Sequence, residues 1–188
     1  MDKFKNKYRI PSARLQSWDY GSNGAYFITI CTHNREHLFG DVVDGKMQLN
    51  ELGKIAEKYW MEIPNHFPFI QLGNFVVMPN HTHGILIINK SPVETPNLGV
   101  STDTNRDTDT GGTAGTGGRN PKWKPKTIGV IINQYKRIVT IKARKIHADF
   151  RWQSRFHDHI IRNAGSFERI QNYIEQNPLK WGKDKFYG

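Results

Sequence analysis

The alternation of hydrophobic and polar positions along the chain predicts four strands. GAYFITICTHN, at 24–34, is rich in β-branched and aromatic residues, which favour a strand. IQLGNFVVMPN and HTHGILIIN, at 70–80 and 81–89, predict two more strands with a Pro-Asn turn between them. A single long strand with a bulge at that point is the alternative. FRWQSRFHDHIIRN, at 150–163, alternates enough to predict a fourth strand.

Three other segments repeat their apolar residues at helical spacing. The first helix is expected to follow Asn50 as its N-cap and to end before Pro64. The last is expected to begin at Ser166 as N-cap and to stop at Pro178. Between them, the segment 121–146 carries one apolar stripe, made of Ile128, Ile131, Ile132, Tyr135, Ile138 and Val139.

The order of these elements, β-α-β-β-α-β-α, indicates the fold class. Two βαβ-like halves around an antiparallel pair make a ferredoxin-like α+β sandwich. We expect an antiparallel sheet with helices packed mainly on one face, including both long helices. Residues 91–120 are mostly Gly, Thr, Asp and Asn, so a flexible insert is expected there. Neither half can close a core alone, and residues 1–188 are therefore expected to form a single domain.

Composition narrows the class of protein. Hydrophobic residues make up 37% of the 188 residues, which is enough for a core, and no apolar run has the length of a membrane helix. The basic N-terminus lacks the apolar segment of a signal peptide. The sole cysteine, Cys31, excludes an intrachain disulfide and a cysteine-cluster zinc site. We therefore expect a cytoplasmic protein without a membrane partner.

The net charge of +10 is concentrated in the last third of the chain. Residues 1–90 carry 10 Lys and Arg against 8 Asp and Glu, and residues 91–120 carry 2 against 4. Residues 121–188 carry 15 against 5. So dense a basic segment indicates a polyanionic partner, most often nucleic acid. A merely soluble cationic surface is the alternative.

Two histidines interrupt the apolar run FVVMPNHTHGILII at 75–88. On a strand, His81 and His83 would point to the same face about 6.5–7 Å apart, whereas a helix would turn them roughly 200° apart. Two imidazoles on one face can bind a metal ion through their Nε2 atoms. Two histidines that are merely satisfied by hydrogen bonds are the alternative. The strand setting favours the metal, as does Gly84, which permits close approach by another element.

Two ligands do not hold a catalytic ion, so a third is expected from a neighbouring element. FHDHII, at 156–161, offers candidates on another predicted strand. We favour His159, because it lies deeper in that strand. His157, Asp158 and Gln134 are the alternatives.

Tyr135 is a candidate nucleophile, although a core tyrosine is the simpler interpretation. Its helical stripe would face the sheet if the helix lies across it, and Lys136 and Arg137 follow it directly. A phenol has a pKa of about 10 and is a poor nucleophile at pH 7. A divalent ion that polarises a phosphodiester, with cations that stabilise the developing charge, would change that.

Six other tyrosines compete with Tyr135. Tyr59 lies near two glutamates and Tyr173 has Glu175 nearby, and a carboxylate is a poor neighbour for a phosphate. Tyr135 alone combines a stripe that faces the sheet with basic residues directly after it. The competitors are Tyr8, Tyr20, Tyr26, Tyr59, Tyr173 and Tyr187.

Basic and aromatic residues are candidates for DNA binding. Trp123 among Lys122, Lys124 and Lys126 is the mixture that stacks on bases and follows phosphates, although packing at the start of a helix would look the same. We expect binding to weaken steeply with salt. The remaining cationic candidates are Lys136, Arg137, Arg151, Arg155, Arg162, Arg9 and Arg14.

Taken together, these segments resemble a known family. MPNHTHGILI, preceded by GAYFITICTHNREHLFG and followed by a tyrosine on a later helix, is similar to the REP-associated tyrosine transposases of the single-tyrosine HUH group. The tail segments WQSRFHDHIIRN and IQNYIEQNPLKW also resemble that family. The resemblance covers nearly the whole chain apart from 91–120. It implies that His81 and His83 are the metal pair and that Tyr135 is the nucleophile.

The same resemblance implies a cofactor and a substrate. The ion would be Mg²⁺ or Mn²⁺, although imidazoles alone would favour Zn²⁺, Mn²⁺ or Ni²⁺. The substrate would be single-stranded DNA beside a hairpin, cut to leave a 5′-phosphotyrosine and a free 3′-OH. The family usually has a bulky apolar residue where this chain has Thr82, and a metal-binding glutamine where it has Val139. Valine cannot bind a metal, so the third ligand is expected from the HDH strand.

The expected function is that of a metal-dependent single-stranded DNA endonuclease and strand transferase, an HUH-type transposase. A non-catalytic nucleic-acid-binding regulator on the same fold is one alternative, and it would bind without cutting. A hydrolase that uses metal-bound water is another, and it would leave no protein–DNA adduct. The sequence leaves open whether the protein is a monomer or a homodimer. It also leaves open whether the tyrosine acts with the histidines of its own subunit or with those of a partner subunit.

Overall fold

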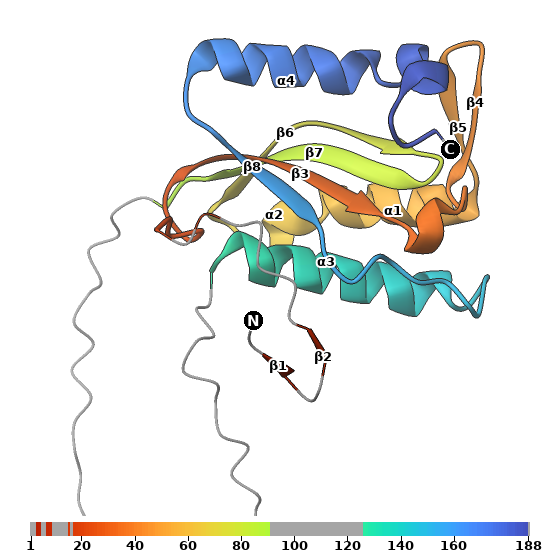
Figure 1. Ribbon diagram of the computed structural model, residues 1–188, viewed down its shortest axis with the longest axis horizontal. Helices are drawn as coiled ribbons and strands as arrows, with labels where there is room; N and C mark the ends of the chain where they lie inside the picture. Colours follow the sequence, from red (N-terminus) through yellow and green to blue (C-terminus); the bar gives the residue numbers. More distant parts are fainter. Residues whose placement is uncertain (1–2, 5–6, 9–14, 16, 91–125, 188) are drawn as a thin grey trace, which may run out of the picture.

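The computed structural model describes residues 3–4, 7–8, 15, 17–90 and 126–187 (Figure 1). Several predictions therefore concern residues outside the described part of the chain. These are the flexible insert at 91–120 and the DNA-binding candidates Arg9, Arg14, Lys122, Trp123 and Lys124.

A four-stranded antiparallel sheet forms the centre of the fold, with the strand order β6-β7-β3-β8. The turn between β6 and β7 falls where the Pro-Asn pair predicts it, so the alternative of one long bulged strand is wrong. The fourth strand is shorter than the predicted 150–163. The four strands are β3 (Gly24–Cys31), β6 (Ile70–Met78), β7 (His81–Ile88) and β8 (His157–Ile161).

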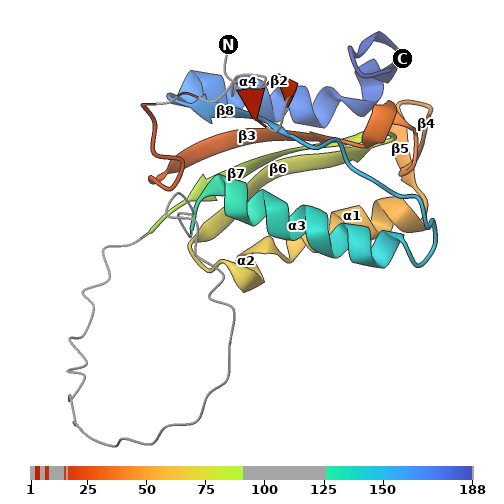
Figure 2. The ribbon, with the colours of Figure 1, turned by 60° about the horizontal axis from the view of Figure 1, so that its bottom comes forward.

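Helices lie on both faces of this sheet. The helices α1 (Glu51–Met61) and α3 (Ile128–Ala143) lie side by side on one face (Figures 1 and 2). On the opposite face lies α4 (Ala164–Gln176), followed by the 3₁₀ helix η2 (Pro178–Lys183). The predicted ferredoxin-like α+β sandwich with its antiparallel sheet is confirmed. The first two long helices, α1 and α3, share one face as expected, but α4, which is longer than α1, covers the other face. No helix within the described residues combines the length and hydropathy needed to cross a membrane.

Asparagine side chains begin both α1 and α4. Asn50 Oδ1 accepts a hydrogen bond from the Gly53 N–H at 3.0 Å, which confirms the predicted N-cap. At α4 the cap is Asn163, whose Oδ1 accepts from the Ser166 N–H at 2.8 Å. Ser166 therefore lies inside the first turn, and its prediction as N-cap is wrong.

The remaining elements are short. The first helix, α1, ends at Met61, before Pro64 as predicted. Pro64 lies in the first turn of a second, four-residue helix, where its missing N–H costs nothing. The other short elements are β1 (Lys3–Phe4), β2 (Lys7–Tyr8), the 3₁₀ helix η1 (His33–Arg35), β4 (Gly40–Val43), β5 (Lys46–Leu49) and α2 (Ile63–His66).

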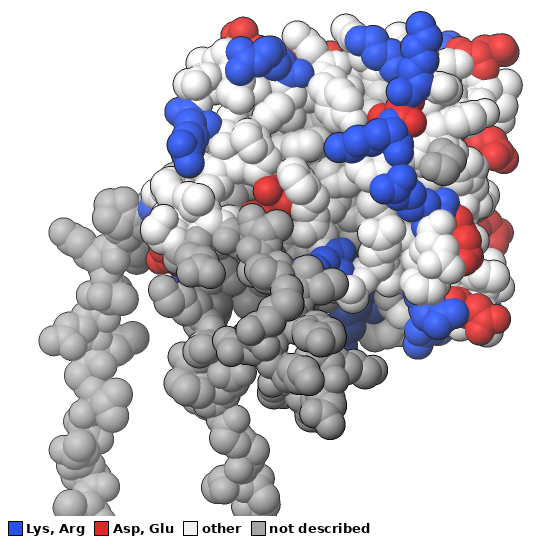
Figure 3. Space-filling model, in the orientation of Figure 1, with Lys and Arg blue, Asp and Glu red and all other residues white. Residues whose placement is uncertain are grey.

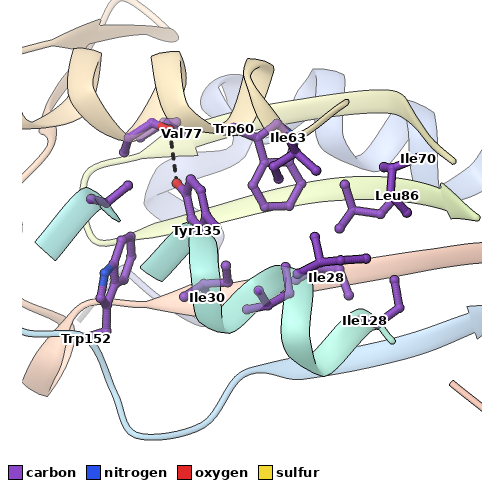
Figure 4. Packing of buried hydrophobic residues seen from close by; sticks show 14 of the residues in the cluster. Ile28, Ile30, Trp60, Ile63, Ile70, Val77, Leu86, Ile128, Tyr135 and Trp152 are labelled. Atoms are coloured by element: carbon purple, nitrogen blue, oxygen red, sulfur yellow. Dashed lines mark hydrogen bonds between the residues drawn. The ribbon is translucent and has the colours of Figure 1, made fainter. Parts of the chain in front are cut away.

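The main core lies between the sheet and the α1/α3 layer (Figure 4). Trp60 of α1 packs directly on β7 at Gly84. A Cβ on Gly84 would lie 2.3 Å from Cζ2 of the indole, so only glycine allows this contact. The expectation that Gly84 permits close approach by another element is confirmed. Other fully buried members include Tyr26, Ile28, Ile30, Ala56, Leu86, Ile128, Ile131, Ile132 and Val139.

Candidate active site

His81 and His83 lie on the face of β7 that is turned away from α1 and α3. They alternate along the strand with Gly84, which faces Trp60 in the main core. Both imidazoles are buried, and their ring centroids are 4.3 Å apart. The prediction that the two histidines share one face of a strand is confirmed.

A polar neighbour holds the Nδ1 atom of each imidazole. His81 Nδ1 lies 2.8 Å from Asn80 Oδ1, and His83 Nδ1 lies 2.8 Å from Thr29 Oγ1. The Asn80 amide is oriented by its own Nδ2, which donates to the carbonyl oxygens of Arg35 and Phe186. Its Oδ1 can only accept, so His81 carries its proton on Nδ1 and presents a lone pair at Nε2. Metal-binding histidines are typically fixed in this way.

The Nε2 atoms are the ones that could bind a metal ion, because a polar neighbour contacts the Nδ1 atom of each ring. His81 Nε2 is buried and has no hydrogen-bond partner among the described residues. Burial, with a smaller effect of Lys185 and Arg35, lowers the pKa of His81 to about 3. Burial and the neighbouring His81 hold the pKa of His83 well below its ordinary value. Both imidazoles are neutral at pH 7, the form that binds a metal ion, so the pair fits two ligands of a divalent cation.

The predicted third ligand, His159, does not join this pair. Thr29 of β3 pairs with His83 on one side and with His157 on the other, whereas His159 pairs with Phe27. His159 is thus displaced along the sheet by two residues, or about 6.5–7 Å. Within the described ranges, no group of three His, Cys, Asp or Glu side chains could hold a metal ion. The prediction of His159 is therefore wrong.

The alternative third ligands differ in their placement. Asp158 pairs with Ile28, a residue of the main core, so it belongs to the face opposite the histidines. Gln134 is exposed on α3, on that same opposite side. His157 shares the histidine face but lies across the intervening strand β3. The third ligand stays open.

Tyr135 lies on the wrong face of the sheet to meet the histidines. Its side chain is enclosed in the main core between Trp60 and Trp152, with ring-centroid distances of 5.3 and 6.0 Å (Figure 4). Its hydroxyl donates to the Ala56 carbonyl oxygen at 3.1 Å, and burial raises its pKa far above the ordinary value. A phenol enclosed on that side cannot reach a phosphate at the pair. The prediction of Tyr135 as nucleophile is wrong.

The tyrosine that meets the histidines is Tyr173 of α4. Its hydroxyl lies 3.2 Å from His83 Nε2, and its ring packs against the edge of Phe27. The side chain is 38% exposed, so a substrate can approach it. The same hydroxyl donates to Asp184 Oδ2 at 3.3 Å. Burial and the adjacent carboxylate of Asp184 raise the pKa of Tyr173 to about 12, so the phenol is protonated at neutral pH.

The helical position of Tyr173 explains why the sequence pattern does not favour it. Glu175 is two residues further on, and two residues on a helix diverge by roughly 200°. Glu175 accordingly points away from the site, where its Oε1 accepts from Asn74 Nδ2 at 2.6 Å. Tyr173 borders the apolar stripe of α4, Ile170 and Ile174, which packs on the histidine face in the structure. The sequence shows the stripe but not which face of the sheet it meets.

A hollow of about 830 Å³ opens beside His83 and Tyr173. Its lining includes three cations, Arg35, Arg155 and Lys185, which can attract phosphate. Arg155 is a predicted DNA-binding candidate, whereas the other two lie outside any pattern in the sequence and are gathered only by the fold. His157, Phe27 and Phe156 also line the hollow.

The other predicted DNA-binding residues are scattered. Lys136 is half-buried, and its Nζ donates to the Gln153 carbonyl oxygen, which is a structural contact. Arg162 lines a separate hollow at the start of α4. In Figure 3, Lys and Arg side chains gather at the upper right, where α4 ends and the C-terminal segment lies. The exposed candidates away from the hollow are Lys126, Arg137 and Arg151.

Comparison with known proteins shows where the chain belongs. No protein-family model matches it. Over 177 residues it is 38% identical to an uncharacterized protein of Haemophilus influenzae (strain ATCC 51907 / DSM 11121 / KW20 / Rd), covering 94% of this chain and 92% of that protein. The chain belongs to the family of that Haemophilus protein.

A solved structure shares the fold of this chain. The structure of a REP-associated tyrosine transposase bound to a REP hairpin aligns with a TM-score of 0.54 and 19% identity, over 98% of this chain and 77% of that chain. A structure from Deinococcus radiodurans R1 aligns less well, with a TM-score of 0.44 and 12% identity over 87% of this chain and 96% of that chain. The resemblance to the REP-associated tyrosine transposases is confirmed at the level of the fold.

Proposed function

We propose that this protein is a metal-dependent single-stranded DNA endonuclease and strand transferase that acts beside hairpin or palindromic repeat DNA. The observation that carries the proposal is the contact between the Tyr173 hydroxyl and Nε2 of His83, at 3.2 Å. It joins a nucleophile and a two-histidine half-site within one chain. The proposed reaction still passes through the 5′-phosphotyrosine intermediate predicted from the sequence, but the tyrosine is Tyr173 instead of Tyr135.

His81 and His83 would hold the divalent ion, Mg²⁺ or Mn²⁺, through their Nε2 atoms. The unpartnered, buried Nε2 of His81 supports this assignment, as do Asn80 and Thr29 behind the two rings. When bound, the ion would polarise a phosphodiester oxygen of the substrate. Thr29 and Asn80 contact the Nδ1 atoms and so orient the two rings with their Nε2 atoms toward that site.

Tyr173 supplies the nucleophile. Its phenolic oxygen attacks the phosphorus, the new O–P bond forms and the P–O3′ bond breaks, leaving a 5′-phosphotyrosine and a free 3′-OH. The phosphotyrosine keeps an ester bond that a second 3′-OH can attack, so strands can be rejoined without a nucleotide cofactor. Arg35, Arg155 and Lys185 around the hollow counter the charge that develops on the phosphate.

The substrate class rests on charge and on the fold. The net charge of +10 favours a polyanion, and the transposase with the same fold was solved with a REP hairpin. Because Tyr173 and His83 meet within one chain, we expect the tyrosine to act on the histidines of its own subunit. A dimer would not be needed to assemble the site.

Covalent capture tests the proposal. Hairpin oligonucleotides with randomised single-stranded flanks are incubated with the protein and Mn²⁺, and adducts that survive SDS are recovered and sequenced. The wild type and Tyr135→Phe should form adducts, and Tyr173→Phe should form none. Tight binding without cleavage would identify a regulator instead. Free 5′-phosphates without adduct would identify a hydrolase, and adducts on Tyr173→Phe would rule out this nucleophile.

A further inference from the structure

Asp184 lies against the hydroxyl that we propose as the nucleophile. Tyr173 donates to Asp184 Oδ2 at 3.3 Å, so the carboxylate touches the reacting oxygen. Two further donors fix the same carboxylate: Asn177 Nδ2 reaches Oδ2 at 2.8 Å, and the Phe186 N–H reaches Oδ1 at 2.8 Å. A carboxylate held by three hydrogen bonds has little freedom to turn away from the phenol.

Asn177 links the position of Asp184 to that of Tyr173. It lies directly after α4, one helical turn beyond Tyr173, and is 1% exposed. Its side chain spans from the end of α4 to the segment that follows η2, where the Asp184 N–H also bonds to the Trp181 carbonyl oxygen at 2.9 Å. The distance between the phenol and the carboxylate is therefore set by the fold and not by two freely moving side chains.

The attack of a phenol on a phosphodiester must release a proton, because a phenol is protonated at neutral pH. Two acceptors lie beside the Tyr173 hydroxyl, His83 Nε2 and Asp184 Oδ2. The lone pair of His83 Nε2 is committed if that atom holds the metal ion. Asp184 is then the basic group that stays available at the hydroxyl.

We propose that Asp184 is the proton acceptor for Tyr173 during strand cleavage, and thus a catalytic residue; this rests on the proposed function. As the Tyr173 Oη–P bond forms, the electron pair of the O–H bond stays on oxygen and the proton passes to the Asp184 carboxylate. The P–O3′ bond breaks with its electron pair on O3′, which takes a proton from water. On rejoining, a 3′-OH attacks the phosphorus and gives its proton to water, the bond from phosphorus to the Tyr173 oxygen breaks, and the Asp184 carboxylic acid returns its proton to the departing phenolate.

Single-turnover adduct formation with a captured hairpin substrate tests this role. Asp184→Asn keeps the size of the side chain and one acceptor but removes the base. The rate should fall by about 10²–10⁴-fold, the usual contribution of a general base, while hairpin binding stays unchanged. Glu168→Gln makes the same change on exposed α4 surface away from the hydroxyl, and its rate should equal that of the wild type.

A more acidic phenol separates proton transfer from positioning. Replacement of Tyr173 by 3,5-difluorotyrosine should restore most of the lost rate in Asp184→Asn, because that phenol ionises without help. If Asp184 only positioned the ring, the fluorinated variant would stay as slow as Asp184→Asn, and the proposal would be overturned. If Asp184→Asn does not fold, Asp184→Ala with added formate takes its place, and recovery of the rate with formate is the expected result.

The outcomes distinguish this proposal from the one on which it rests. A wild-type protein that forms no adduct with any hairpin refutes the proposed function and the role of Asp184 with it. A wild-type protein that forms a Tyr173-dependent adduct, with Asp184→Asn equally fast, refutes the role of Asp184 alone.

Discussion

The two faces of the central sheet carry different chemistry although they share the same strands. The α1/α3 face is an apolar core in which the Tyr135 hydroxyl donates to the Ala56 carbonyl oxygen. The α4 face holds two buried imidazoles, a partly exposed phenol and a carboxylate within hydrogen-bonding reach of that phenol. Strand β7 contributes to both, because its alternate residues point in opposite directions.

Two tyrosines illustrate the difference. Tyr135 is 2% exposed and Tyr173 is 38% exposed, and each has one hydroxyl hydrogen-bonded to a neighbouring element. The same side chain is thus a packing residue on one face and a candidate nucleophile on the other. What separates them is access to substrate and the nature of their partners, neither of which is a property of tyrosine itself.

The largest expected effect separates the two phenols. Tyr173→Phe should reduce adduct formation by more than about 10⁴-fold, because it removes the attacking oxygen while leaving the ring. Tyr135→Phe should form adducts at the wild-type rate but lower the free energy of unfolding by about 0.5–1.5 kcal/mol, since the hydrogen bond from the hydroxyl to the Ala56 carbonyl oxygen is lost. Denaturing gels and urea unfolding measure the two effects. If only Tyr135→Phe lost adduct formation, Tyr135 would be the nucleophile and the active site would lie on the α1/α3 face.

Metal binding should be confined to the α4 face. Mn²⁺ at 100 times its dissociation constant should raise the free energy of unfolding by about 2.7 kcal/mol, because the ion binds the folded state alone. The gain should vanish in the double variant His81→Gln/His83→Gln and persist in His159→Gln. Urea unfolding with and without Mn²⁺ gives the difference. A gain that disappears with His159→Gln would restore that residue as a ligand.

Acid should destabilise the protein through the buried imidazoles of the same face. Their folded-state pKa values are lowered, to about 3 for His81, so the unfolded chain binds protons first as the pH falls. Stability should be constant above about pH 6.5, the ordinary histidine pKa, and then fall by about 1.4 kcal/mol per pH unit for each histidine. Urea unfolding in chelator between pH 7 and pH 5 measures the slope, which should flatten in His81→Gln/His83→Gln.

The smallest expected effect concerns salt. Binding of a hairpin substrate should weaken steeply as salt rises, because phosphate contacts release counterions. Arg155→Ala at the hollow should reduce the slope of log affinity against log salt by about 1, whereas Arg137→Ala on α3 should not change it. Fluorescence anisotropy at several salt concentrations gives both slopes. Equal slopes for the two variants would mean that the DNA does not bind preferentially at the hollow that Arg155 lines.

The sequence by itself determined the elements and their alternation. The order of strands and helices predicts the ferredoxin-like sandwich, and the spacing of His81 and His83 predicts that they share a face of β7. Gly84 and the Asn50 cap could also be predicted, because each meets a local requirement of backbone space or hydrogen bonding. These are properties of short stretches of chain, where period and residue type carry the information.

Only the tertiary structure decided which helix covers the histidines. Both faces of β7 are buried, so periodicity states which residues point together but not which distant segment they meet. The meeting of His83 with Tyr173, and of Tyr173 with Asp184, depends on how α4 and the C-terminal segment fold back over the sheet. An apolar stripe is equally expected of a core helix and of a helix over an active site, which is why it could not separate Tyr135 from Tyr173.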